Sequence, residues 1–75
     1  MPPDRTIISV SVAEAIEGEV MGAINRAGGH ITDVRREGEH STGIGATVPR
    51  ESLASLKVWL RIFSNGQGRI AEDIQ

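Results

Sequence analysis

The feature that most constrains the fold is residues 18–31, where a helical pattern ends at two glycines and a strand pattern follows at once. The apolar side chains of this helical pattern recur at the spacing of one helical face: Ile16, Val20, Ala23, Ile24 and Ala27. Gly28 or Gly29 can adopt the left-handed conformation that ends a helix, because glycine has no Cβ. The pattern therefore predicts a helix that ends at Ala27 and a strand that begins at His30.

The opposite face of this helix combines small residues with polar ones: Gly18, Met21, Gly22 and Asn25. Each glycine inside a helix costs about 1 kcal/mol relative to alanine. One interpretation is that the glycines let another molecule approach the helix backbone, with Asn25 and Arg26 beside them as polar contacts. The other interpretation is that Gly18 lies in a frayed first turn and that Gly22 is merely tolerated. The residues alone leave both interpretations open.

The composition indicates one small globular domain. The chain has 75 residues, of which 39% are hydrophobic and 24% are charged, and a chain of this length builds only a thin core. The formal charge of −2 and the pI near 5.6 argue against a broad basic surface for nucleic acid but allow local basic contacts. Because the chain has no cysteine, it forms neither a disulfide nor a thiolate zinc site.

The sequence carries no membrane or secretion signal that we can identify. No apolar run approaches the roughly 18 residues of a membrane span, and the start, Met-Pro-Pro-Asp-Arg, lacks the pattern of a signal peptide. We therefore expect a cytoplasmic protein without a membrane partner. We also expect residues 1–5 to form a flexible lead-in and residues 6–75 to form a single domain.

Three segments have the apolar spacing of half-buried strands. In the first, residues 6–12, the apolar positions on one face are Ile8, Val10 and Val12. In the second, residues 30–37, Ile31 and Val34 have opposite parity, which either a β-bulge or an early switch of face would reconcile. Residues 38–41 are expected to form a hairpin turn. The third strand alternates at Ile44, Ala46 and Val48, and its other face carries Gly43 and Gly45.

A second helix is predicted over residues 50–63, because Pro49 ends the third strand and suits the first turn of a helix. Its core stripe is expected to be Leu53, Leu56, Leu60 and Phe63. Three apolar side chains lie on its far side or flank: Val58, Trp59 and Ile62. A helix that is apolar nearly all round in so small a domain usually covers a second surface. We therefore expect a partner interface at these three residues.

The order of elements predicts the fold. Ile70 and Ile74 indicate a short fourth strand within residues 69–75. The succession strand, helix, strand, strand, helix, strand is typical of an α+β, ferredoxin-like βαββαβ sandwich, with a four-stranded antiparallel sheet and two helices on one face. The first and third strands are central in this arrangement, which agrees with their regular alternation.

We find no residues that indicate catalysis, a cofactor site or a metal site. His30 and His40 flank the hairpin and lack the helical spacing of paired metal ligands. Three carboxylates gather at the start of the first helix, where negative charge favours the helix dipole: Glu14, Glu17 and Glu19. The glycine-bearing segments 43–45 and 66–68 lack the strand-loop-helix context and the Gly-Lys-Ser/Thr of a P-loop. We therefore predict a domain that is not an enzyme.

Several motifs resemble one known family. The pattern Gly18-x-Val20-x-Gly22-x-Ile24-Asn25-Arg26-x-x-Gly29-x-Ile31 resembles the first helix and second strand of the C-terminal domain (domain V) of elongation factor G and related translational GTPases. Further matches at unbroken spacing are Ala46-x-Val48-Pro49, Leu60-Arg61 and Ser64-Asn65-Gly66. The form Phe63-Ser64-Asn65-Gly66 is closer to the tetracycline-resistance ribosomal protection proteins. The resemblance covers residues 7–70 and departs at residues 53–55, where the family has an aromatic-glycine pair.

The resemblance implies a non-catalytic module that contacts ribosomal RNA and protein near the stalk base and packs on the GTPase domains of its parent factor. The expected RNA contact is the outer face of the first helix, with Gly18, Gly22, Asn25 and Arg26, because phosphate contacts position a protein without reading sequence. The expected contact with the rest of the factor is formed by Val58, Trp59 and Ile62. Further candidates for phosphate contact are Arg35, Arg36, Arg61 and Arg69.

The same fold allows a different function. A free-standing ferredoxin-like module can form a homodimer through its second helix or its sheet and bind a small ligand. Recognition of single-stranded RNA by aromatic residues on the central strands is disfavoured, because the predicted central strands carry none.

Overall fold

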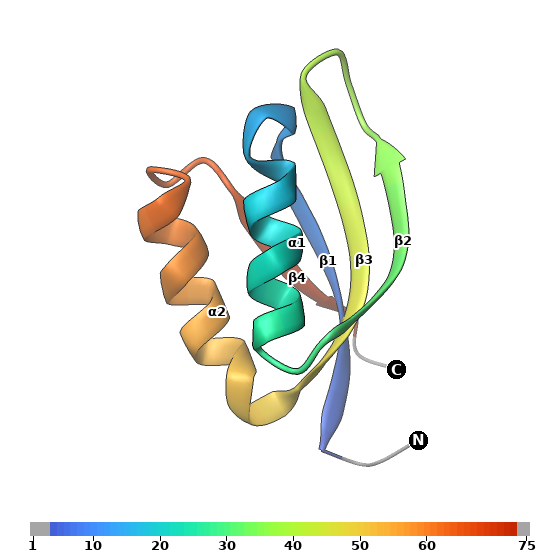
Figure 1. Ribbon diagram of the computed structural model, residues 1–75, viewed down its shortest axis with the longest axis vertical. Coiled ribbons are helices and arrows are strands. Elements are labelled where there is room, and N and C mark those ends of the chain that lie inside the picture. The colour runs from blue at the N-terminus through green and yellow to red at the C-terminus, as the bar shows by residue number, and fades with distance from the viewer. Residues whose placement is uncertain (1–3, 74–75) are drawn as a thin grey trace.

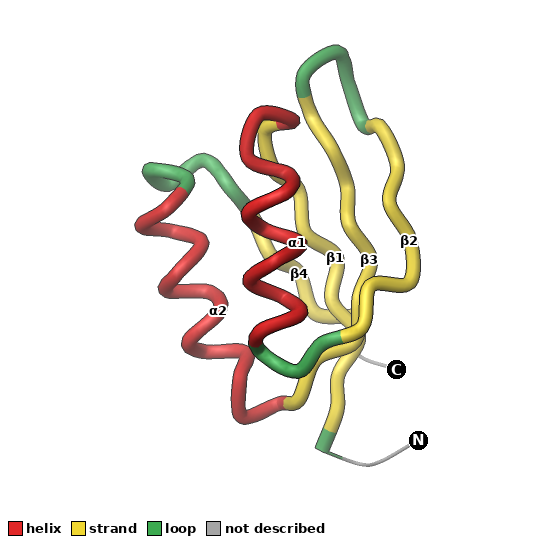
Figure 2. The backbone as a smooth tube through the Cα atoms, in the orientation of Figure 1, coloured by secondary structure: helices red, strands yellow, loops and turns green. Residues whose placement is uncertain are grey.

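The computed structural model describes residues 4–73, which form a sheet covered on one face by two helices (Figures 1 and 2). In chain order the elements are β1 (Arg5–Ala13), a 3-10 turn (Glu14–Ile16), α1 (Glu17–Arg26), β2 (His30–Arg36), β3 (Ser41–Pro49), α2 (Arg50–Phe63) and β4 (Arg69–Asp73). The predicted α+β, ferredoxin-like fold is confirmed. Neither helix in this part of the chain is long and apolar enough to cross a membrane.

The four strands are antiparallel and lie in the order β2-β3-β1-β4, so β1 and β3 are central, as predicted. Ile8 pairs with Ala46, and Val10 pairs with Ile44, on the face that the helices cover. Side chains alternate along a strand, so Ser9 and Gly45 lie opposite each other on the open face. Twelve buried apolar side chains form the core: Ile8, Val10, Val12, Val20, Ala23, Ile24, Ile44, Ala46, Val48, Leu53, Leu56 and Leu60.

Of the two explanations for the irregular spacing in β2, the structure shows the bulge. The register of β2 on β3 shifts between Ile31 and Asp33. Ile31 therefore pairs with Ala46, and Val34 pairs with Ile44, which places both on the helix-covered face despite their opposite parity. Val34 is still 42% exposed, because β2 is an edge strand.

The end of α1 follows the predicted glycine cap, and Gly28 is the residue that adopts it, with φ of 85°. The N–H of Gly29 donates to the carbonyl of Ile24 at 2.9 Å, and the N–H of Gly28 donates to the carbonyl of Asn25 at 3.1 Å. These two bonds form a Schellman motif. The chain therefore leaves α1 and enters β2 within three residues.

The end of α2 uses the same motif with a different residue. Asn65 has φ of 58°, and the N–H of Gly66 donates to the carbonyl of Arg61 at 2.8 Å. Asparagine tolerates this conformation better than most residues. Ser64 Oγ then accepts a hydrogen bond from the N–H of Gly68 at 2.8 Å, which folds the loop back toward β4.

Two predicted positions are wrong. Phe63 is 44% exposed and does not belong to the core stripe of α2. The loop after α2 brings Gly68 against Leu60, where an added Cβ would lie 2.9 Å from Leu60 Cγ, so this loop closes the core at Leu60. Met21 was assigned to the outer face of α1 but is partly buried and packs on the core. It lies about 100° round the helix from Val20, and its long side chain reaches back to the sheet.

Some predictions concern residues outside the described part of the chain. These are residues 1–3 of the expected lead-in and Ile74 of the expected fourth strand. The described part of the chain places Arg5 as the first residue of β1 and ends β4 at Asp73.

Candidate functional site

The outer face of α1 contains glycines that the packing of the domain does not require. A Cβ added at Gly18 would meet nothing within 4 Å. A Cβ at Gly22 would lie 3.3 Å from Arg26 Nη1 and near nothing else outside its own helix. Gly18 is the second residue of α1, and a 3-10 turn directly precedes this helix. Gly22 lies in the middle of the helix. Neither glycine is therefore explained by a neighbouring element.

Asn25 and Arg26 lie in the last turn of α1, and both are exposed. Neither side chain makes a hydrogen bond or an ion pair with another residue of the part that the structure describes. The guanidinium of Arg26 lies over Gly22, one turn earlier, because side chains in a helix point toward its N-terminus. The end of this flexible side chain can move by a few tenths of an ångström, so its position does not require a glycine at position 22.

Three other cations of the domain lie beside a carboxylate. Arg35 contacts Asp33 at 2.9 Å, Arg36 contacts Glu14 at 3.1 Å, and Lys57 lies 3.8 Å from Glu72. Arg61 and Arg69 are exposed and, like Arg26, have no ion pair among residues 4–73. Of the arginines predicted to contact phosphate, two are therefore already neutralised by a neighbouring carboxylate.

The open face of the sheet is polar, and polar side chains on it form hydrogen bonds with one another. Arg35 Nη2 donates to Ser9 Oγ at 3.3 Å, and Ser11 Oγ donates to Glu37 Oε1 at 2.8 Å. Both contacts bridge from β2, or from the residue after it, across β3 to β1. Gly43 leaves room for the second contact, because a Cβ there would lie 2.6 Å from Glu37 Oε2. This face differs from the outer face of α1, where the polar side chains are unpaired.

Two of the three carboxylates at the start of α1 have structural contacts. Glu17 Oε1 accepts a hydrogen bond from the buried hydroxyl of Thr42 at 2.8 Å, and Glu14 pairs with Arg36. These contacts tie the start of α1 to β3 and β2. Among residues 4–73, no group of three or more histidine or carboxylate side chains is arranged to hold a metal ion.

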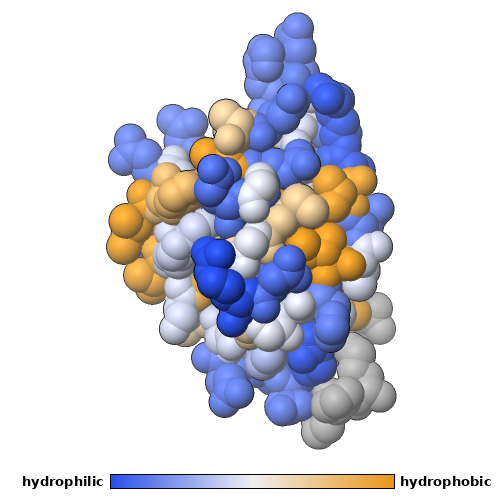
Figure 3. All heavy atoms as spheres, viewed as in Figure 1, coloured by the Kyte–Doolittle hydropathy of each residue, from blue (hydrophilic) through white to orange (hydrophobic). Residues whose placement is uncertain are grey.

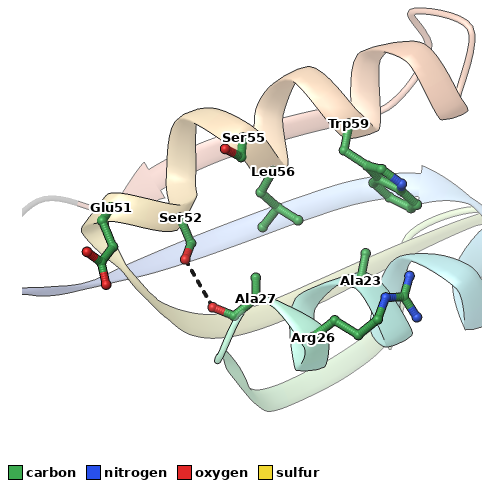
Figure 4. Close-up of a pocket in the computed structure, with 8 residues that line it drawn as sticks. All are labelled: Ala23, Arg26, Ala27, Glu51, Ser52, Ser55, Leu56 and Trp59. Carbon is green, nitrogen blue, oxygen red and sulfur yellow. Dashed lines mark hydrogen bonds between the residues drawn. The ribbon is translucent and has the colours of Figure 1, made fainter.

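A groove of about 340 Å³ lies between the two helices, which run in opposite directions (Figures 1 and 4). It is lined by Ala23, Arg26, Ala27, Glu51, Ser52, Ser55, Leu56 and Trp59. Small side chains on both helices leave the space open, and Ser52 Oγ donates to the carbonyl of Ala27 at 3.1 Å across one end. The groove brings together Arg26 and Trp59, which the sequence analysis assigned to separate surfaces.

The far side of α2 forms a second exposed surface, here termed the α2 apolar surface. It comprises Val58, Ile62 and Phe63, with exposures of 52%, 74% and 44%, and the flanking Trp59. The ring centroids of Trp59 and Phe63 are 4.8 Å apart, and the two planes are 11° from parallel. Figure 3 shows hydrophobic side chains along this outer edge of α2. The predicted exposure of Val58 and Ile62 is confirmed, while their role as an interface stays a prediction.

The fold and these surfaces define the chain as an α+β, ferredoxin-like domain. A comparison with models of known protein families gives no match, and a comparison with curated protein sequences gives none either. The likeness to domain V of elongation factor G therefore rests on the motifs quoted above.

Proposed function

We propose that this chain is a non-catalytic, ribosome-contacting domain of an elongation factor G-like protein. Its RNA contact is the outer face of α1, near the base of the ribosomal stalk. One observation carries the proposal: this face keeps Gly18 and Gly22 without any packing need, beside the unpaired side chains of Asn25 and Arg26. The same four residues belong to the motif that resembles domain V.

The physical basis is close approach to a charged backbone. Without side chains at positions 18 and 22, the sugar-phosphate chain of an RNA can come nearer to α1 than it could to an ordinary helix. Arg26 supplies a cation that no carboxylate in the described part neutralises, and Asn25 supplies an amide donor. Contacts of this kind fix position and orientation without reading base sequence. Gly22, in the middle of α1, costs about 1 kcal/mol relative to alanine, which contact with a partner would offset.

The α2 apolar surface supports the second half of the proposal. Three large hydrophobic side chains on one helix, each more than 40% exposed, suit docking against another protein surface. We assign this surface to contact with the GTPase domains of a longer factor. Its exposed side chains lie on α2, whereas the residues of the RNA contact lie on α1.

The test measures binding of the purified domain to ribosomes by co-sedimentation at low salt. The paired change Asn25→Ala with Arg26→Ala should weaken binding about tenfold, and Lys57→Ala should leave it within about twofold. Lys57 is a suitable control because it is exposed, carries the same charge and lies on α2. The proposal would be overturned if the unaltered domain did not bind ribosomes, or if the paired variant and Lys57→Ala lost the same amount of affinity.

A homodimer that binds a small ligand is the second candidate, and the α2 apolar surface is the observation that favours it. Light scattering of the unaltered chain and of Ile62→Glu separates the possibilities, because Ile62 is 74% exposed and its replacement leaves the core intact. A dimer that Ile62→Glu dissociates would support this candidate. A dimer that persists in the variant would exclude α2 as its interface.

A further inference from the structure

The groove between α1 and α2 combines one unpaired cation with one aromatic ring above an apolar floor. Arg26 and Trp59 line it from opposite helices, and its floor is formed by Ala23, Ala27 and Leu56 (Figure 4). Its volume of about 340 Å³ lies at the small end of the range for ligand pockets, about 300–1,000 Å³. The groove therefore suits one ring system with an anionic group attached.

Trp59 has one ring face available to an occupant of the groove. Phe63 lies one turn further along α2 and stacks on one face of Trp59, with the ring centroids 4.8 Å apart. The other α2 residues that line the groove all precede Trp59: Glu51, Ser52, Ser55 and Leu56. Trp59 is partly buried against the core and lines the groove, so an occupant can stack only on the ring face that Phe63 leaves uncovered. The stack with Phe63 also fixes the orientation of the indole.

The charges of the groove limit what can occupy it. The guanidinium of Arg26 lies over Gly22 and has no ion-pair partner in residues 4–73. Glu51 lines the other end, eight residues before Trp59 and so about 12 Å away along α2. A phosphate is favoured beside Arg26 and repelled beside Glu51. The groove thus accommodates one phosphate rather than a strand that runs along its whole length.

We propose that this groove binds one unpaired nucleotide, with its base stacked on the free face of Trp59 and its phosphate on Arg26. The inference rests on the proposed function, in which the nucleotide belongs to ribosomal RNA; a free nucleotide presents the same chemistry. Unpaired bases bind proteins by stacking on aromatic side chains, and such stacking tolerates any base. A base within a duplex cannot enter, because both of its faces are already stacked.

The fluorescence of Trp59 provides a direct test, because it is the single tryptophan of a chain without tyrosine. A short single-stranded oligoadenylate should quench this fluorescence saturably, and a fully paired RNA duplex should not. Ser55→Leu, which fills the groove from an exposed position on α2, should weaken the binding about tenfold, the effect of losing one base stack. Arg26→Gln should weaken it about fivefold.

Matched controls separate groove filling from other effects. Ala54→Leu adds a leucine at the neighbouring exposed position outside the groove, and Lys57→Gln removes one charge elsewhere on α2. Both should bind within about twofold of the unaltered protein. Quenching by adenosine monophosphate at the same affinity would support the groove and assign it to free nucleotides. Failure of both single strand and mononucleotide to quench, equal quenching by the duplex, or full binding by Ser55→Leu would overturn the inference.

Ribosome co-sedimentation distinguishes this inference from the proposed function. One result is that ribosome binding is weakened by the paired change Asn25→Ala with Arg26→Ala and unaffected by Ser55→Leu. That result would overturn the proposal of a nucleotide in the groove and would support the proposed ribosome contact. Saturable quenching by the oligoadenylate without any ribosome binding would support the groove and overturn the proposed function.

Discussion

Two glycines near α1 differ in what the fold requires of them. A Cβ at Gly29 would lie 2.7 Å from Ile24 Cγ2 and 2.8 Å from Val48 Cγ1, and both of those side chains are fully buried. At Gly18 the same addition meets nothing within 4 Å. Packing therefore demands glycine at position 29 and leaves position 18 unconstrained. The packing of the domain therefore gives no reason for a glycine at position 18.

The stability of two alanine variants should reflect this difference. Gly29→Ala should lower the free energy of unfolding by about 1–3 kcal/mol, the cost of overpacking a core. Gly18→Ala should leave the free energy of unfolding unchanged or raise it by up to about 1 kcal/mol, because alanine is the better helix former. Urea denaturation of the two variants measures both values. A loss of more than about 1 kcal/mol in Gly18→Ala would show that the domain itself needs this glycine.

At the scale of elements, Arg5 holds the α1–β2 loop against the sheet. Its Nη2 donates to the carbonyls of Gly28 and Thr47, each at 3.1 Å, and lies 3.3 Å from Thr47 Oγ1. Arg36 also bridges two elements, but its side chain is 67% exposed and its partner Glu14 is 47% exposed. The two arginines have the same charge and differ in how their partners are shielded from water.

Arg5→Ala should therefore destabilise the domain by about 1–2 kcal/mol, since it removes charge-assisted hydrogen bonds to backbone carbonyls. Arg36→Ala should change the free energy of unfolding by no more than about 0.5 kcal/mol, as is usual for an exposed ion pair. Thermal or urea unfolding of both variants under one buffer condition gives the comparison. Equal effects of the two changes would contradict the role assigned to Arg5.

The elements themselves were predictable because their signals are local. The parity of Ile31 and Val34 indicated an irregularity in β2, either a bulge or a switch of face, and the apolar stripe of α2 predicted its bounds. Phe63 was placed wrongly because its environment depends on Gly68, which returns to cover Leu60 from beyond the helix. The apolar spacing of a helix does not reveal which of its side chains a later loop will exclude from the core.

The groove could not be predicted for a similar reason. It exists because small side chains on two separate helices face each other, with Ala23 and Ala27 on one side and Ser52 and Ser55 on the other. Each pair is unremarkable in the sequence, and only the antiparallel placement of α1 and α2 brings them together (Figure 4). The polar network above Gly43 likewise depends on contacts that cross three strands.

At the scale of the whole molecule, the net charge of −2 limits how the domain can bind RNA. Binding must rely on a few local contacts, since the chain as a whole does not attract a polyanion. A plot of the logarithm of the ribosome-binding constant against the logarithm of salt concentration should therefore have a slope of about −1 to −3. Each phosphate that the protein neutralises contributes about −0.7 to −0.9 to this slope. Replacing Arg26 by alanine should make this slope less steep by about 0.7–0.9, the contribution of one phosphate. A slope near −6, unaltered in the variant, would indicate a different surface.

The central claim is that the outer face of α1 contacts RNA, and the most direct test adds a side chain where the domain has room for one. Gly18→Gln and the control Ala54→Gln place the same side chain at exposed positions of α1 and α2. Gly18→Gln should not lower the free energy of unfolding, because glutamine is a better helix former than glycine, and Ala54→Gln should lower it by no more than about 0.5 kcal/mol. The measurement is the affinity of each variant for ribosomes. We expect Gly18→Gln to lower the affinity about tenfold and Ala54→Gln to leave it unchanged. Ribosome binding by Gly18→Gln that equals that of the unaltered protein would show that the outer face of α1 does not contact RNA.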